Sequence, residues 1–374
     1  EYSMWNILAS LPNTDTNESI NIYKKLLNSN NETSLKIKST VQCNLGSQLT
    51  LTKKFREALI YINECIKNKE KIYGKNSFQK LYSNIYLAKL YSGKGQFELE
   101  NDLLIELADF IKSNNLNRFN TRLNLYLNSE IARSFYNQKK LMKSREFLHN
   151  GFTEYILHLH KNLPLIPIEN RTSFANSVFA SNLQRQILTY NFENELIYKN
   201  LVLFSQLNRQ GLLEELERRQ YQISSLTGQT KKLSDKLRII NQKFSSIDVD
   251  QKQQQFLKTE KEKLEKKLYR ILPKLKPQIV EIKDISRVMP KETLLIEFKH
   301  YKPINKDQHY LSKESSPARY LAMVLDPSKK ERDEYGRLTN YKIHSIDLGL
   351  AEPLEQKIKQ ALNASEKGLK DATS

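Results

Sequence analysis

The sequence predicts a mainly helical protein: an α-solenoid of repeated hairpins, then a long helical coiled hairpin, then the incomplete N-terminal part of an α/β domain. Three observations predict this class. Small residues recur at intervals of 42 and 44 residues in the first part, a heptad-like apolar stripe runs through the middle, and short apolar runs replace it near the end. Glycine and proline number only 10 each among 374 residues, which favours helices over a turn-rich all-β fold.

Small residues mark three copies of a helical hairpin. Gly46 is followed after 12 positions by Ala58, and Ala88 and Ala132 repeat the position of Gly46 after 42 and then 44 residues. We expect Gly46, Ala88 and Ala132 to lie on helix A, the first helix of each hairpin. Ala58 and Ser144 should lie on helix B, the second helix. Two helices approach closely only where their side chains are small, and each hairpin exposes an apolar stripe that a neighbouring hairpin must cover.

This spacing resembles that of tetratricopeptide (TPR) repeats. The simple repeat has about 34 residues, so a period of 42 or 44 implies longer helices. The prediction is therefore a TPR-like α-solenoid over residues 1–165. The second copy departs from the pattern, because Glu100 stands where helix B should carry a small residue.

The resemblance implies a protein or peptide ligand on the concave face of the solenoid, which helix A lines. Polar helix-A residues between the packing positions are the candidates for this contact. The alternative is that they are ordinary exposed residues. The candidate peptide-binding residues are Asn44, Gln48, Asn84, Lys89, Asn128 and Arg133.

The cysteines and histidines of this part favour packing over chemistry. Cys43 and Cys65 are too few for a disulfide framework, and Cys65 falls at a position of helix B where a small packing residue is expected. His158 and His160, two positions apart, would point about 200° apart on a helix, so with His149 they form no metal site on one face. We expect neither a metal nor a cofactor.

Residues 166–275 read as a helical connector and an antiparallel coiled hairpin. Two prolines in the segment 163–168 interrupt the helical pattern, and the polar segment 245–250 separates two apolar stripes. The hairpin is either a structural spacer or a lever that carries a signal from the repeats to the next domain. The first stripe is Leu216, Ile223, Leu226, Leu233, Leu237, Ile240 and Phe244, and the second is Leu257, Leu264, Leu268, Ile271 and Leu275.

Residues 276–374 change to strand-like runs. The segments 294–298, 320–325 and 341–348 predict three strands, of which the second is apolar throughout, as in a strand covered on both faces. The polar segment 326–340 reads as a loop. A helix should follow near Pro353, since proline is tolerated in the first turn.

These runs resemble the opening of a CHAT domain, a caspase-like module usually found behind TPR repeats. They are Leu294–Pro303 (LLIEFKHYKP), Arg319–Pro327 (RYLAMVLDP), Tyr341–Gly349 (YKIHSIDLG) and Ala351–Gln360 (AEPLEQKIKQ). Leu201–Gln220 resembles the helix that joins the repeats to that domain. The resemblance implies a cysteine peptidase whose His–Cys dyad cleaves a protein substrate.

The dyad itself is missing from this sequence. Neither a Thr-His-Gly-like nor a Ser-Ala-Cys-like motif precedes Ser374, no cysteine follows Cys65, and His300, His309 and His344 stand outside such motifs. No catalytic residue is therefore assigned, and we expect this chain alone to have no peptidase activity. The few strands cannot bury a full core, so we expect the natural protein to continue beyond Ser374.

Three functions remain open at this point. The first is a protein-interaction and regulatory segment of a TPR-CHAT protein, and the second is a non-catalytic adaptor. The third is a nucleic-acid binder, which the net charge of +18 suggests but the interleaving of Lys and Arg with Asp and Glu disfavours. No apolar run approaches the roughly 20 residues of a membrane span, and no secretory signal stands at the start, so the cytoplasm is the expected location.

Overall fold

The computed structural model describes residues 15–28, 34–114, 121–163, 168–175, 178–212, 215, 218, 221–222, 225–244, 251–272, 279–304 and 316–373. The chain divides into two compact units, residues 1–148 and 149–374. The first unit is helical, and the second combines helices with a small antiparallel sheet. None of the helices in the described part has the length and hydrophobicity that crossing a membrane requires.

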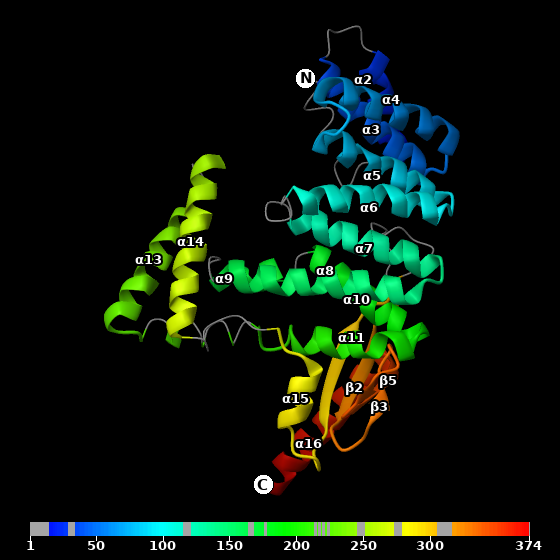
Figure 1. Ribbon diagram of the computed structural model, residues 1–374. Helices are drawn as coiled ribbons and strands as arrows, with labels where there is room; N and C mark the ends of the chain where they lie inside the picture. Colours follow the sequence, from blue (N-terminus) through cyan, green and yellow to red (C-terminus); the bar gives the residue numbers. More distant parts are fainter. Residues whose placement is uncertain are drawn as a thin grey trace. The chain divides into compact units, whose positions relative to one another are not determined.

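Paired helical hairpins build the first unit, as the spacing of small residues predicts (Figure 1). Each helix packs against the next along the chain from α2 to α7, and α3 also contacts α5 directly. The helices of this unit are α2 (Thr16–Asn28), α3 (Leu35–Leu51), α4 (Phe55–Tyr73), α5 (Phe78–Gly93), α6 (Phe97–Ser113) and α7 (Thr121–Asn137). The next helix, α8 (Leu141–Asn162), begins in the first unit and continues into the second.

Three of the hairpins share one turn. Lys53, Gly95 and Lys139 all have a left-handed backbone, with φ of 59°, 72° and 61°, and they are spaced by the same 42 and 44 residues as the small positions. In the first turn the amide of Lys54 donates to the carbonyl of Leu49, 2.9 Å away, which is the six-residue bond of a Schellman C-cap. The same bond joins Gln96 to Tyr91 and Lys140 to Phe135, at 2.9 Å in both cases.

The small residues lie where helix A meets helix B. A Cβ atom on Gly46 would come within 2.4 Å of a side-chain carbon of Ile62 and 3.2 Å of the carbonyl oxygen of Ala58. Ala88 and Ala132 are buried at the equivalent places on α5 and α7. The predicted close approach is confirmed at Gly46, where no larger side chain fits without displacing Ile62, and Ala88 and Ala132 are buried as predicted.

A hydrogen bond from a buried side-chain amide to an exposed carboxylate repeats with the hairpins. The side-chain amide of Gln42 donates to Glu64 at 2.6 Å, and that of Asn84 donates to Glu106 at 3.3 Å. Each pair joins helix A to helix B across 22 residues, and the two pairs are 42 residues apart. The two hairpins therefore share a polar contact as well as their apolar spacing.

The two cysteines, which the sequence analysis treats as packing residues, form a disulfide. Cys43 on α3 and Cys65 on α4 are both buried, and their Cα atoms are 5.4 Å apart. The bond crosses the same interface as Gly46 and closes a chain segment of 22 residues. In the chain-entropy model a loop of this size stabilises the folded state by about 3 kcal/mol.

Helices of the second unit follow the predicted connector and coiled hairpin. The hairpin is confirmed as two helices, α13 and α14, that contact each other, with Leu264 and Leu268 of its stripe buried and Ile271 exposed. Leu226 precedes α13, and Leu216, Ile223 and Leu275 lie outside the described residues. The helices are α9 (Ile168–Ala175), α10 (Val178–Glu193), α11 (Glu195–Leu207), α13 (Gly228–Phe244), α14 (Gln251–Ile271) and α15 (Ile282–Val288).

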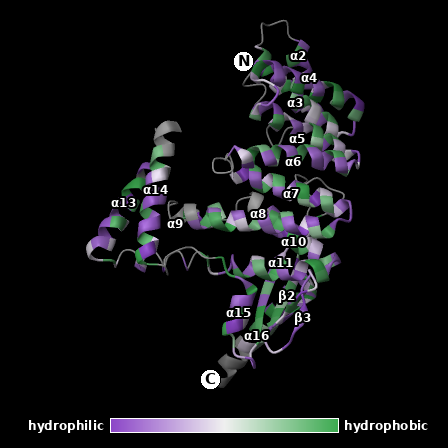
Figure 2. Cartoon of the chain, in the orientation of Figure 1, coloured by the Kyte–Doolittle hydropathy of each residue, from purple (hydrophilic) through white to green (hydrophobic). Residues whose placement is uncertain are grey.

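The predicted strands pair in the order β1–β2–β5, all antiparallel, and the 23-residue helix α16 (Ala351–Thr373) follows them. Apolar residues run along much of β2 (Figure 2), and α11 contacts β2 and β5. The strands are β1 (Leu295–Tyr301), β2 (Arg319–Asp326) and β5 (Lys342–Leu350).

The segment 326–340 is more than the loop that the sequence predicts. It holds a short hairpin of β3 (Glu331–Arg332) and β4 (Leu338–Thr339), closed by a turn in which Asp333 accepts from the amides of Tyr335 and Arg337. Its strands are only two residues long and hold a single apolar residue, Leu338, so neither apolar alternation nor length marks them in the sequence.

The repeated turn predicts a gain of stability on substitution. A side chain in the left-handed region costs about 1 kcal/mol that glycine avoids. We therefore expect Lys53→Gly and Lys139→Gly each to raise the urea midpoint of unfolding, followed by circular dichroism, and Gly95→Ala to lower it. Lys54→Gly, at a neighbouring residue with φ of −81°, is the matched control and should not stabilise. A destabilising Lys53→Gly would contradict the shared turn.

Candidate functional site

The six candidate peptide-binding residues lie on the three A helices, two on each. Asn44 and Gln48 are on α3, Asn84 and Lys89 on α5, and Asn128 and Arg133 on α7. We call the surface that these helices form the helix-A face. All six candidates therefore lie on A helices, although their side chains differ in burial and in hydrogen-bond partners.

Three of the candidate amides have partners within the repeats. Asn84 is buried and donates to Glu106 on α6, while the Asn128 amide donates to the carbonyl of Asn124 at 2.9 Å. Asn44 accepts from the Tyr86 hydroxyl at 3.4 Å. These bonds fix the side chains within and between hairpins.

Arg133 joins a cluster of charges between α6 and α7. Its guanidinium contacts Glu100 at 2.5 Å and Glu130 at 2.8 Å. The Glu100 and Glu130 side chains are almost fully buried, at 2% and 4% exposure, whereas that of Arg133 keeps 25%. The departure at Glu100 is therefore accommodated by an ion pair: a carboxylate replaces the small residue, and an arginine from the next hairpin neutralises it.

Burial raises the pKa of Glu100 to about 7, because the buried carboxylate loses its hydration. Arg133 lowers this pKa, Glu130 raises it by like-charge repulsion, and the hydroxyls of Ser134 and Ser92 lower it. The close contact with Arg133 favours an ionised Glu100, but desolvation is the larger effect. The carboxyl group is consequently poised to titrate near neutral pH.

Lys89 is half-buried on the same face. Its ammonium lies over the Tyr126 ring, 5.8 Å from the centroid. Burial lowers the pKa of this lysine, and the nearby charge of Glu130 offsets part of the shift. Lys89 thus faces an aromatic ring where Arg133 faces carboxylates.

Tyrosines of this face were missed by the sequence analysis, which selected only amides and cations. Tyr82 on α5 is 40% exposed, and Tyr126 on α7 repeats its position 44 residues later. The repeat spacing was the signal that could have found them, because Ala88 and Ala132 are separated by the same interval.

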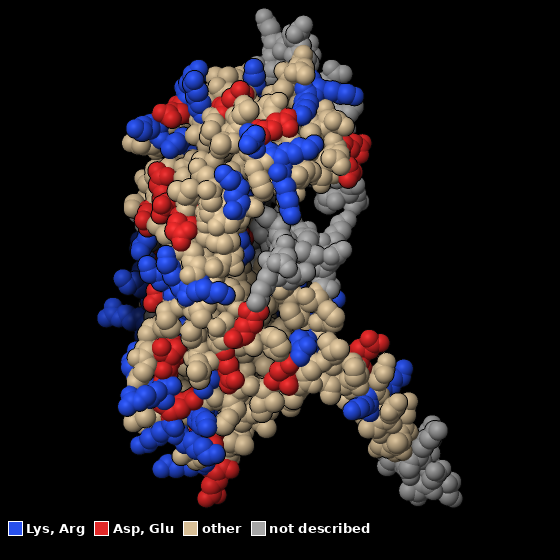
Figure 3. Space-filling view, turned by 90° about the vertical axis from the view of Figure 1, so that its right-hand side faces the viewer, with Lys and Arg blue, Asp and Glu red and all other residues tan. Residues whose placement is uncertain are grey.

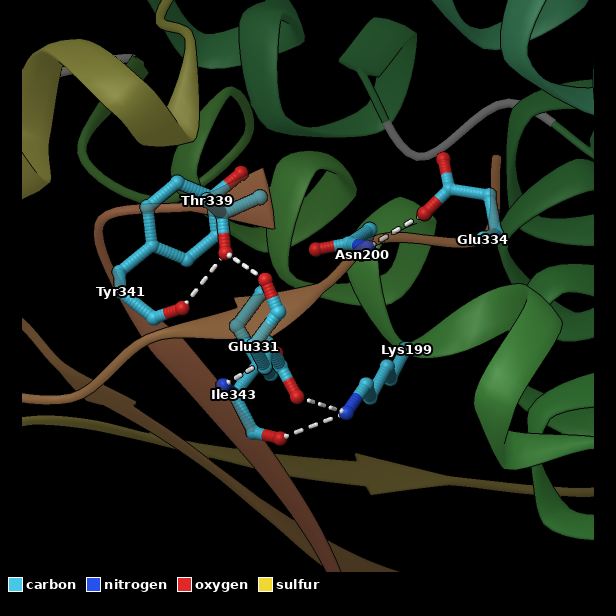
Figure 4. A network of polar contacts seen from close by, with 7 residues as sticks. All are labelled: Lys199, Asn200, Glu331, Glu334, Thr339, Tyr341 and Ile343. Atoms are coloured by element: carbon cyan, nitrogen blue, oxygen red, sulfur yellow. Dashed lines mark hydrogen bonds and ion pairs between the residues drawn. The ribbon is translucent and has the colours of Figure 1, made fainter. Parts of the chain in front are cut away.

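A second polar cluster lies in the other unit, between α11 and the sheet (Figure 4). The Lys199 ammonium contacts Glu331 at 2.6 Å and donates to the Ile343 carbonyl at 3.1 Å. The other oxygen of Glu331 accepts from the amide of Ile343 at 2.7 Å. With side-chain exposures of 8% and 13%, the pair is largely desolvated, and both charges are satisfied by hydrogen bonds.

Neighbouring bonds extend this cluster over the β3–β4 hairpin. The amide of Asn200 donates to Glu334, and the Thr339 hydroxyl lies 2.9 Å from the carbonyl oxygen of Glu331 and 2.7 Å from that of Tyr341 (Figure 4). Burial raises the pKa of Tyr341 to about 12. The bonds of Lys199 and Asn200 hold α11 to β5 and to the hairpin that the sequence predicts as a loop, while those of Thr339 lie within the hairpin and the segment that follows it.

Histidines and cysteines do not meet in the described part of the chain. His300 on β1 packs against Tyr320, with ring centroids 5.1 Å apart, and His344 is half-buried on β5. His309 lies outside the described residues. Cys43 and Cys65 are bonded to each other in the first unit, so neither is a thiolate nucleophile in this state.

Comparison of the chain with known protein families, with curated proteins and with solved structures finds no match. The two polar clusters, and the repeats that carry the first of them, are therefore the features that bear on function.

The pKa of Glu100 predicts a stability that falls as pH rises. The folded state holds the proton up to about pH 7 and the unfolded state only to about 4.5, so raising the pH between these values costs up to about 3 kcal/mol of unfolding free energy. Glu100→Gln stays neutral and should flatten this dependence. Urea unfolding at pH 5 and pH 8 measures it. Asp109→Asn, an exposed carboxylate on the same helix, is the control and should keep the wild-type slope.

The ion pair of Lys199 and Glu331 predicts that removing the lysine strongly destabilises the β3–β5 region, and that the effects of changing both residues are not additive. Lys199→Met leaves the Glu331 carboxylate buried without its cation, and breaking such a pair costs about 3 kcal/mol or more. We expect faster hydrogen exchange of the β3–β5 amides, measured by mass spectrometry, with partial recovery in the double variant Lys199→Met/Glu331→Gln. Lys283→Met, at an exposed lysine on α15, should exchange like the wild type. Equal exchange in both lysine variants would contradict a stabilising role for the pair.

Proposed function

We propose that this chain is the protein-interaction and regulatory segment of a TPR-CHAT protein, and that its repeats bind a protein or peptide segment on the helix-A face. One observation carries the proposal: the same hairpin recurs at 42 and 44 residues with the same Schellman turn and with a small buried residue on each helix A. In such repeats the apolar faces of neighbouring hairpins pack against one another, and the A helices line an extended binding surface.

The regulatory part of the proposal is supported by the contacts of α11. Phe204 on this helix packs against His149 and Phe152 of α8, with ring centroids 4.9 and 6.1 Å apart. Lys199, on the same helix, bonds to Ile343 of β5. A displacement of the last part of α8 would reach the sheet through a single helix. In this proposal the sheet is the opening of a caspase-like domain whose His–Cys dyad is absent from the present sequence.

A non-catalytic adaptor is the second candidate. It is favoured by the disulfide between the only two cysteines in the sequence, because that bond leaves no thiol for a peptidase dyad within this chain. The adaptor would use the same helix-A face, so the experiment below tests the binding role that both candidates share. Nucleic-acid binding has less support, since basic and acidic side chains are interspersed over the face drawn in Figure 3.

An array of unrelated 15-residue peptides, probed with the whole chain, tests the binding role. We expect bound peptides to lose at least about tenfold in affinity, or about 1.4 kcal/mol, when Gln48 and Tyr82 on the A helices are both changed to alanine. Ile60 and Leu99 are exposed residues of helices α4 and α6, and their double alanine variant is the control. Equal losses in both variants, or no peptide bound by the wild type, would reject the proposed surface.

A further inference from the structure

Lys89 and Arg133 occupy the same position in successive hairpins. They are 44 residues apart, the interval that separates Ala88 from Ala132, and each directly follows one of these packing residues. Their surroundings differ. Arg133 is held by two buried carboxylates, Glu100 and Glu130. The face therefore carries two equivalent cations, of which the second is already neutralised.

Lys89 lacks such a neutralising contact. Within the described residues its ammonium has the Tyr126 ring at 5.8 Å and no hydrogen-bond acceptor. A cation–π contact offsets part of the lost hydration, but three N–H donors still lack acceptors. A half-buried ammonium in this state gains more from an added carboxylate than a hydrated lysine does, because its desolvation has already occurred on folding.

We propose that the helix-A face binds an acidic peptide segment, with one carboxylate of that segment on the Lys89 ammonium beside Tyr126. The inference rests on the proposed function and names the ligand class of the same surface. Tyr82 occupies the position equivalent to Tyr126 in the preceding hairpin and is 40% exposed. Its ring can contact an apolar residue of the peptide next to that carboxylate.

A peptide carboxylate suits this position better than a nucleic-acid backbone. Glu130 lies close enough to act on Lys89, so a dianionic or repeated phosphate would meet repulsion that a single carboxylate meets less. A phosphate backbone also needs successive cations, and the next equivalent one, Arg133, is occupied by Glu100 and Glu130. Lys89, which in the described part of the chain has no carboxylate contact like that of Arg133, therefore matches a single carboxylate.

Fluorescence anisotropy with three labelled probes tests the proposal on the whole chain. The probes are a peptide of four Glu-Gly-Ser units, the same peptide with glutamine in place of glutamate, and a 12-nucleotide thymidine strand. We expect the glutamate peptide to bind at least about tenfold more tightly than the glutamine peptide at 150 mM salt, consistent with a charge-assisted contact.

Variants locate the contact. Lys89→Met should weaken binding of the glutamate peptide about fivefold or more, and Lys89→Arg, which keeps the charge, should retain most of it. Lys112→Met removes the same charge from an exposed position on α6 and should change binding less than about twofold. Circular dichroism and the urea midpoint of each variant establish that it folds.

Each contrary result has a distinct meaning. Equal losses in Lys89→Met and Lys112→Met would reduce the effect to general attraction by a basic surface and overturn the proposal. Tighter binding of the thymidine strand, insensitive to Lys89, would assign the charge to nucleic acid instead. If the glutamine peptide binds as well as the glutamate peptide and still depends on Gln48 and Tyr82, the binding surface stands but its acidic preference fails.

Discussion

The close approach of helix A to helix B within each hairpin is the constraint on which the first unit depends. At Gly46 the two backbones come so near that even a methyl group would overlap Ile62. The left-handed turn at Lys53 sets this approach, because it reverses the chain in three residues after α3 ends. A longer or differently shaped turn would separate the helices, and the disulfide, the amide–carboxylate bonds and the apolar core between them all need that short separation.

The charged cluster on the helix-A face follows from one violation of this constraint. In the second hairpin Glu100 takes the small position, so a carboxylate enters the helix interface. Without Arg133 its charge would be buried without a cation, and Glu130 accepts from the same guanidinium nitrogen that bonds Glu100. As a result of this burial, the pKa of the Glu100 carboxyl is raised to about 7. The helix-A face thus carries Arg133, which is paired with carboxylates, and the equivalent cation Lys89, which has no such contact among the described residues.

Local patterns explain which parts of the fold the sequence predicts. The spacing of Gly46, Ala88 and Ala132 reports contacts within a hairpin, and such contacts repeat in the sequence because the hairpins repeat. The bond between Lys199 and Glu331 joins residues 132 positions apart, and it leaves no periodic trace. The disulfide was missed for a related reason. Two cysteines 22 apart become neighbours only once the lengths of both helices and the turn between them are known.

In the second unit α11 supports the proposed regulation because, after its exposed first turn, the helix is buried on every side as far as Gln206. All nine residues from Tyr198 to Gln206 are buried, so this part of the helix has no solvent-facing side and is packed all around. Two of them carry polar groups that bond outside the helix: the Lys199 ammonium bonds to Glu331 of β3 and to β5, and the Asn200 side-chain amide donates to Glu334 between β3 and β4. Moving α11 would leave a buried cation without its partners unless the strands moved with it. We therefore expect the helix and the sheet to move together, which is the property that the proposed regulatory connection through α11 requires.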